Sequence, residues 1–373
     1  TYRDHLGDAR AAITAYETAL DIDEDHGDTM DALEALYRDQ DRLEALRALL
    51  ERRVARAFDG ERSAIQLRLA RLCEEAFRDP EAAITILREV LDSDPDNLAA
   101  YTDLERLFEA TEAWDELIAL ILSRVAEASD VGQRDMLQHV AEIHDGKRGD
   151  TEAAIRVYER IETDLGPNEH TLRALADLYQ RECRWTKVAD VLERLSSRVQ
   201  APEAVELCHR VIDLYEQEIG DQEQAGRALR AAYERFPGDE RTRQRIKAYH
   251  ESRNEYEPLV RVLDDELELT SSDADRVALL RRISDIHRDQ LADPGTAASY
   301  LERAVELDGS DRGALVPLCD LYVAAGREAE AVPLLQQIIE SFGKQRSKEL
   351  AVYYHRLGRA LAGMSDSVGA LQA

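Results

Sequence analysis

The sequence predicts an all-α fold, a solenoid of about ten helical hairpins stacked in one continuous array. Two observations predict it: a composition typical of long helices and an internal repeat with a period of about 71 residues. Hydrophobic residues make up 44% of the 373 residues and charged residues 34%, with only 18 Gly and 9 Pro. Alternating segments of β-branched and aromatic residues are missing, so no sheet is expected.

The repeat is visible in several independent registers. Ala11-Ala12-Ile13 recurs as Ala82-Ala83-Ile84 and again, at the same spacing, as Ala153-Ala154-Ile155. In the next two copies the full Ala-Ala-Ile segment is lost, but an alanine is kept at the same spacing to within one position, as Ala225 and Ala297. The same spacing, to within one position, relates two further sets: Leu33, Leu104, Leu175, Ile246 and Leu318; Trp114 and Trp185. Because the registers agree, we predict a super-repeat of two hairpins, about 35 and 36 residues each.

The hairpins follow from the local pattern. Apolar residues recur at three- and four-residue spacing, which gives each helix an apolar stripe that a lone hairpin cannot cover. Stacking against neighbouring hairpins covers it. Breakers mark the turns: Gly7-Asp8, Asp79-Pro80, Gly149-Asp150, Gly220-Asp221 and Asp293-Pro294. In these turns Asp is expected to cap the next helix, and Pro fits the first helical position.

Two segments carry a family resemblance. In one, Leu172-Arg173-Ala174-Leu175-Ala176-Asp177-Leu178-Tyr179 precedes Trp185, Val188, Leu192 and Leu195; in the other, Leu315, Leu318, Leu321 and Tyr322 precede Gly326, Ala329 and Val332. Both resemble the tetratricopeptide repeat, whose period is about 34 residues. The alternate hairpins have the family's small second-helix residue, as in Ala83, Ala154, Ala225 and Ala297, and some have its closing proline, as in Pro95 and Pro237.

The alternate hairpins depart from the family by one extra residue in the first helix or turn. Several small first-helix positions also hold other residues: Glu105, Ile212, Lys247 and Cys319. Related helical-hairpin repeats, including those of RNA-processing scaffolds, remain an alternative. The resemblance implies a right-handed superhelical solenoid in which the first helix of each hairpin lines a concave groove.

We expect residues 1–373 to form a single continuous solenoid. Both ends of the sequence stop within a repeat. Tyr2 to Leu6 match the tail of a first helix, and Val368 to Leu371 match the start of a second one. The expectation is a fragment cut from a longer array at both ends.

The charge and the cysteines narrow the class of protein. A formal net charge of −29 disfavours binding to nucleic acid or anionic membrane, and the best basic run, Arg241 to Lys247, has acidic neighbours. No apolar run approaches the length of a membrane span, and no signal peptide is visible. The four cysteines form no C-x-x-C motif, so we interpret them as buried free thiols. With the Arg-rich composition, they lead us to expect bacterial cytoplasm.

The candidate chemistry is sparse, and we predict no enzyme, cofactor or metal site. His139, Glu142 and His144 lie on one helix, but a metal would need further converging ligands, so we interpret the histidines as core or surface residues. Cys208 and His209 are adjacent and point about 100° apart on a helix, which does not suit a thiolate pair. The acidic run 21–25 lacks the glycine and spacing of a calcium loop.

The resemblance implies a set of groove residues, because fixed first-helix positions point into the groove. These positions are mainly acidic in the central stretch, with some cationic and polar neighbours. The predicted groove residues are Glu142, Asp145, Arg173, Asp177, Gln180, His209, Asp213, Glu216, Glu251, Asp285 and Asp320. Carboxylates in these positions would steer and pair Lys or Arg of a partner.

We therefore predict a non-catalytic protein–protein interaction scaffold that binds peptide or helix segments of partner proteins along its concave groove. If the groove is acidic, the bound segments are expected to be basic. A shallow repeat surface suits this role better than catalysis. Two alternatives remain: a structural spacer or assembly element that self-associates through its repeat ends, and a regulatory repeat region of a multidomain protein.

Overall fold

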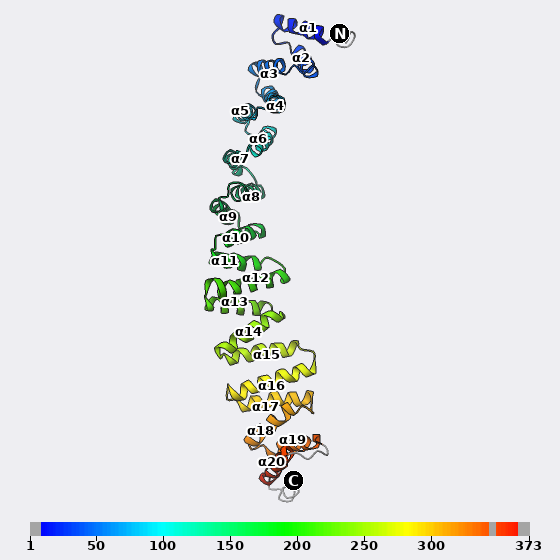
Figure 1. Ribbon diagram of the computed structural model, residues 1–373, viewed down its shortest axis with the longest axis vertical. Helices are drawn as coiled ribbons and strands as arrows, with labels where there is room; N and C mark the ends of the chain where they lie inside the picture. Colours follow the sequence, from blue (N-terminus) through cyan, green and yellow to red (C-terminus); the bar gives the residue numbers. More distant parts are fainter. Residues whose placement is uncertain (1–8, 343–347, 365–373) are drawn as a thin grey trace. The chain divides into compact units, whose positions relative to one another are not determined.

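The computed structural model describes residues 9–342 and 348–364. Within these ranges the chain forms helices joined by short turns and contains no strand (Figure 1). The structure confirms the predicted all-α solenoid of helical hairpins. The turn at Gly7-Asp8 and the two chain ends at Tyr2 to Leu6 and Val368 to Leu371 lie outside the described residues.

Contacts between residues divide the chain into two compact units, 1–171 and 172–373. The continuity of the array across this division stays a prediction. In unit 1 the helices are α1 (Ala9–Ile22), α2 (Gly27–Asp39), α3 (Leu43–Arg56), α4 (Asp59–Glu75), α5 (Pro80–Ser93), α6 (Leu98–Ala110), α7 (Trp114–Val125), α8 (Asp130–Gly146) and α9 (Thr151–Leu165).

Helix α10 (Glu169–Arg181) begins just before unit 2, which holds the remaining helices. These are α11 (Trp185–Ser196), α12 (Ala201–Asp213), the π-helix η2 (Leu214–Ile219), α13 (Gln222–Arg235), α14 (Glu240–Arg253), α15 (Tyr256–Leu269), α16 (Asp273–Asp289), α17 (Pro294–Leu307), α18 (Arg312–Ala324), α19 (Glu328–Ser341) and α20 (Lys348–Gly363). Even-numbered helices are the first helices of the hairpins, and odd-numbered ones are the second.

The first helices alternate in length, which explains why the sequence repeats in pairs of hairpins. Helices α2, α6, α10 and α18 have 13 residues, whereas α4, α8 and α16 have 17. At the equivalent place in unit 2, α12 runs directly into the π-helix η2. The alternate hairpins do have longer first helices, as predicted, but by four residues rather than the predicted one.

Asp caps begin the second helices of the longer hairpins, as predicted. The carboxylate of Asp79 accepts a hydrogen bond from the backbone N–H of Ala82 at 3.0 Å, and Asp150 accepts one from Ala153 at 2.9 Å. Asp221 and Asp293 repeat the arrangement in unit 2, each at 3.0 Å from the backbone nitrogen three residues on. Each cap satisfies an N–H that has no partner within its helix.

The turns between the two helices of each hairpin repeat one backbone conformation. Residues with positive φ recur at the period of the super-repeat in two series: Asp41, Glu112, Cys183, Asn254 and Gly326; Arg78, Gly149, Gly220 and Ala292. Their φ values lie between 52° and 76°, the left-handed region that residues with a Cβ adopt at a cost. The turn geometry is therefore preserved even where the residue is unfavourable.

Small and apolar residues form the core of each unit. In unit 1 one cluster of buried side chains extends from Ala12 to Ile143, and in unit 2 the buried side chains form several clusters. The predicted small residues Ala83, Ala154, Ala225 and Ala297 are at most 3% exposed. Such residues let neighbouring helices approach closely.

One close approach in unit 2 is specific to its copy of the repeat. Gly226 of α13 lies against the ring of Tyr249 of α14, and a Cβ added to the glycine would be 2.2 Å from the tyrosine oxygen. The other copies have larger residues facing leucine at these two positions, in the pairs Ile13 and Leu36, Ile84 and Leu107, Ile155 and Leu178, and Ala298 and Leu321. A large ring in α14 is thus matched by the loss of a side chain in α13.

Candidate functional site

Most of the predicted groove residues lie at the surface of the first helices. Glu142, Arg173, Asp177, Gln180, Glu216, Glu251, Asp285 and Asp320 are exposed, and Asp145 and Asp213 are half-buried. The structure thus places ten of the residues where a partner could reach at least part of the side chain. The exception is His209.

His209 is buried, which corrects its assignment as a groove residue. Its side chain is 2% exposed, and its Nε2 lies 3.2 Å from a carboxylate oxygen of Asp239 and 3.3 Å from the hydroxyl of Thr242. Asp239 also accepts a hydrogen bond from the backbone of Thr242 and so caps α14. His209 therefore joins α12 to the start of the next first helix, and its ring is not available to a ligand.

In unit 2, the predicted carboxylates pair with arginines of the same chain. Arg245 of α14 donates to Asp213 at 2.7 Å and to Glu216 at 2.9 Å. Arg356 of α20 donates to Asp320 at 2.5 Å. In each pair the arginine comes from the next first helix along the chain.

The other predicted residues of unit 2 follow the same pattern or pair within their own helix. Glu251 is bonded to Arg282, and Gln180 to Arg210, both from the next first helix. Arg173 donates to Glu203 of α12 at 2.7 Å. Asp177 and Asp285 pair with arginines one turn later, Arg181 at 3.2 Å and Arg288 at 2.9 Å. These carboxylates already have internal cations, so unit 2 does not present a bare acidic groove.

In unit 1, helices α6, α8 and α10 bring carboxylates next to histidines instead. His139 lies 3.9 Å from Glu105 and 4.0 Å from Glu109, and His170 lies 4.0 Å from Glu142. We call these five residues the carboxylate–histidine cluster. Within the described part of the chain, none of its three glutamates pairs with an arginine or lysine.

Asp145 extends the negative charge near this cluster. It lies one turn beyond Glu142 in α8, near Tyr158 of α9. Burial, together with the charges of Glu142 and Asp145, raises the pKa of Tyr158 to about 12. The ring of Tyr158 packs 6.4 Å from that of His170. The three helices α6, α8 and α10 therefore hold a negatively charged surface, and the Tyr158 ring of α9 is buried next to it.

The charge of the first helices changes along the chain. Acidic residues outnumber basic ones in each of α2, α4, α6 and α8. From α14 onward, basic residues equal or outnumber acidic ones in every first helix. In α12 and the following η2 of unit 2 acidic residues also outnumber basic ones, so the acidic character of the first helices extends beyond unit 1 and ends before α14.

No arrangement typical of a catalytic or metal centre emerges from residues 9–342 and 348–364. No group of three or more His, Cys, Asp or Glu in these ranges is close enough to hold a metal ion. Cys73 and Cys319 are buried and Cys208 is half-buried, but Cys183 is exposed in the turn before α11. The expectation of buried thiols is thus wrong for Cys183. None of the described helices combines the length and apolarity that crossing a membrane requires.

Comparison with known proteins gives the class of the fold and then the family. Models described as tetratricopeptide repeat match residues 290–350 and residues 1–26. With the hairpins and the repeat described above, the chain is an α-helical repeat protein of the kind that binds other proteins. In these two segments it matches the tetratricopeptide repeat family. That family is generally a non-catalytic interaction module.

Similar solved structures include a chain of Naa15/Naa10 bound to HypK-THB, with 16% identity, a TM-score of 0.37, and coverage of 99% of this chain and 61% of that one. The P58(IPK) TPR domain has 16% identity, a TM-score of 0.24 and coverages of 97% and 95%. The C-terminal part of a TPR repeat-containing protein from Cytophaga hutchinsonii has 15% identity, a TM-score of 0.32 and coverages of 62% and 90%.

This chain spans about three fifths of the Naa15/Naa10 chain that it matches. No curated protein matches the sequence. Because all three TM-scores are low, the resemblance to the tetratricopeptide repeat depends on the two matched segments and on the chain's own repeat.

Proposed function

We propose that the chain is a protein-interaction scaffold that binds a basic segment of a partner protein at the carboxylate–histidine cluster of unit 1. Glu105, Glu109 and Glu142 are the groups that would receive Lys or Arg. The observation that supports this location is the difference in partners: these glutamates face histidines, whereas the predicted carboxylates of unit 2 are held by arginines.

The difference matters because an incoming cation must compete with the partner already present. At Asp213 and Glu216 a ligand would have to displace a guanidinium that donates to both carboxylates, or share them with it. Near Glu109 and Glu142 the neighbour is an imidazole, which carries no charge when unprotonated, at the outer limit of an ion pair. An arginine of a partner that donates two hydrogen bonds to a carboxylate would therefore bind more strongly near Glu109 and Glu142 than at Asp213 and Glu216.

The test is binding of a fluorescent Lys/Arg-rich peptide, followed by anisotropy at low and high salt. We expect binding to weaken as salt rises, because the contacts are exposed charge pairs. Glu109→Arg combined with Glu142→Arg should weaken binding at low salt at least about tenfold, the effect of losing about 1.4 kcal/mol.

The matched control is Asp213→Arg combined with Glu216→Arg, which changes the charge by the same amount in unit 2. We expect this pair to have a smaller effect, since both carboxylates are already paired with Arg245 and Asp213 also lies 3.7 Å from Arg241. Equal loss in both variants would point to the net charge of the chain rather than to the cluster. Failure of the peptide to bind at any salt would favour the spacer or assembly role.

A further inference from the structure

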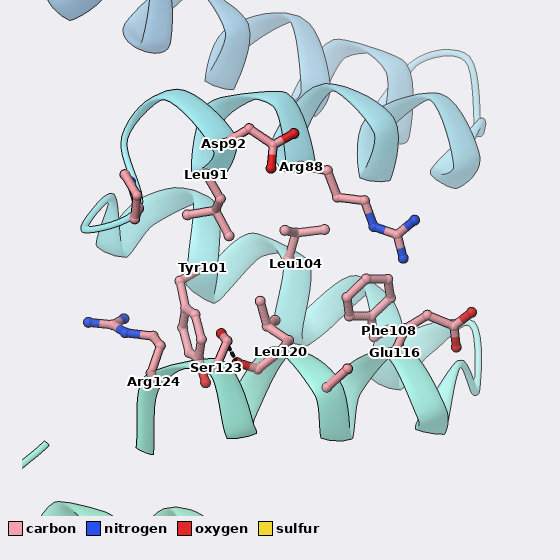
Figure 2. Close-up of a pocket in the computed structure, with 12 residues that line it drawn as sticks. Arg88, Leu91, Asp92, Tyr101, Leu104, Phe108, Glu116, Leu120, Ser123 and Arg124 are labelled. Atoms are coloured by element: carbon pink, nitrogen blue, oxygen red, sulfur yellow. Dashed lines mark hydrogen bonds between the residues drawn. The ribbon is translucent and has the colours of Figure 1, made fainter. Parts of the chain in front are cut away.

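The second helices of unit 1 form an apolar cleft that repeats along the chain. Helices α5 and α7 line its two sides, and α6 forms its floor (Figure 2). The cleft has a volume of about 430 Å³. Leu91 of α5, Leu104 of α6 and Leu120 of α7 face it, and it is open to solvent.

A second cleft occupies the equivalent place one super-repeat earlier, between α1 and α3 over α2. Its volume is about 280 Å³. Lining residues of the two clefts correspond at the spacing of the super-repeat: Leu20 and Leu91, Leu33 and Leu104, Tyr37 and Phe108, Ala48 and Ala119, Leu49 and Leu120. The leucines and the small alanine that leave the space open thus occur in both copies, so the cleft is built by the repeat itself.

The rims of the two clefts differ in charge. In the α1–α3 cleft, Glu17 accepts a hydrogen bond from the hydroxyl of Tyr37 at 2.7 Å, and Arg52 lies 3.7 Å from Glu24. In the α5–α7 cleft, Arg88 replaces Glu17 and lies 5.4 Å from the centre of the Phe108 ring. Glu17 and Arg52 of the α1–α3 cleft are therefore engaged within the chain, whereas Asp21 adds a carboxylate to its lining.

The α5–α7 cleft has arginines at both ends. Arg124 lies over the Tyr101 ring at 4.7 Å and marks one end, and Arg88 marks the other, on the same side as Glu116 (Figure 2). Within the described residues, neither arginine forms an ion pair. Asp92 and Glu116 also line the cleft, but within the described residues neither forms an ion pair with these arginines. Arg124, which stacks on Tyr101 at the end of the cleft away from Glu116, is therefore a cation that a carboxylate of a partner can pair with.

We propose that the α5–α7 cleft is a docking site for a partner segment that carries apolar side chains followed by a carboxylate. The apolar side chains enter over Leu104 between Leu91 and Leu120, and the carboxylate pairs with Arg124. This surface and this ligand chemistry differ from the basic segment proposed at the first helices, so the site is a second, independent one.

The test begins with a library of random peptides displayed on phage and selected on the whole chain. Selected peptides are then labelled and titrated by fluorescence anisotropy against the chain and its variants. Ala119→Glu fills the cleft and repels an acidic ligand, and Ala119 is exposed, so the helix should tolerate the change. Ala99→Glu is the matched control, an exposed alanine on α6 that does not line the cleft.

The expected result is a group of peptides that combine Leu, Ile or Phe with Asp or Glu, and that bind the chain and Ala99→Glu equally but lose affinity for Ala119→Glu. Arg124→Gln should weaken their binding about tenfold, and replacing their acidic residues by Lys should remove it. Circular dichroism of each variant confirms folding. The proposal is overturned if no selected peptide is sensitive to Ala119→Glu, or if the sensitive peptides bind equally after their acidic residues are changed to Lys.

Discussion

The contact between Gly226 and Tyr249 predicts a strong, reciprocal dependence between two positions of unit 2. Replacing Gly226 by Ile, the residue of three other copies of the repeat, would place a Cβ 2.2 Å from the Tyr249 oxygen and 2.5 Å from its Cζ. Ordinary contact begins near 3.4 Å, so the ring must move by more than about 1 Å.

That movement has two costs. Overpacking of a close contact destabilises by about 1–3 kcal/mol. The ring also leaves Arg230, which donates to the Tyr249 hydroxyl at 3.2 Å, a bond worth about 1 kcal/mol. Gly→Ile on a helix gains a few tenths of a kcal/mol in propensity, so the net loss for Gly226→Ile should be about 2–3 kcal/mol. Tyr249→Leu alone leaves space beside the glycine and should also destabilise.

The double variant restores the pair found at Ile155 and Leu178, so it should be more stable than Gly226→Ile. We expect a coupling free energy of about 1–3 kcal/mol from the double-mutant cycle. Urea denaturation followed by circular dichroism measures the free energy of unfolding. Because repeat arrays need not unfold in one step, hydrogen exchange of the α13 and α14 amides shows whether the loss of stability is confined to these helices. Wild-type stability of Gly226→Ile, or a double variant no more stable than that single one, would refute this account of the contact.

Three further outcomes follow from the turns, caps and ion pairs. Ala292→Gly should raise stability by about 1 kcal/mol in thermal unfolding, because φ is 52° there and Gly220 is the equivalent residue one copy earlier; a loss would show that the alanine side chain is needed. Asp150→Ala should cost about 1 kcal/mol and Asp150→Asn much less, measured the same way, and equal losses would contradict a capping role. The hydrogen bond from Arg106 lowers the pKa of Glu74, so the pair stabilises above the ordinary carboxyl range near pH 4.5 and loses its effect as pH falls through the lowered value. Glu74→Gln should therefore cost a few tenths to about 1 kcal/mol at pH 7, and this difference should disappear in acid; a constant difference in urea titrations across pH would argue against the pair.

The sequence predicted the repeat, the hairpins and the caps because those features depend on local pattern. The periodic recurrence of Ala-Ala-Ile and the position of Asp150 before a helix both report contacts within a hairpin. Most of the predicted groove residues are exposed, since a 3.6-residue period fixes which face of a helix is exposed, but their role as a groove stays a prediction.

The partners of those surface residues could not be predicted from the sequence. Arg245 lies 32 residues after Asp213, and whether its side chain reaches back depends on the spacing of neighbouring first helices. The burial of His209 likewise depends on its contacts with Asp239 and Thr242, from the next hairpin. A signal for the pairing was present in the recurrence of Arg about 30 residues after a predicted acid, a periodicity between hairpins rather than within a helix.

The alternation of shorter and longer first helices has a consequence for how this array could be lengthened or shortened. A single hairpin is not an interchangeable part, because removing one would join two hairpins of the same type, whose packing surfaces are shaped for the other type. Removing one whole super-repeat joins hairpins in their native order, with the left-handed residue of each turn and each Asp cap in register. The unit of duplication and deletion in this protein is therefore the pair of hairpins, and engineered versions should change length by whole pairs.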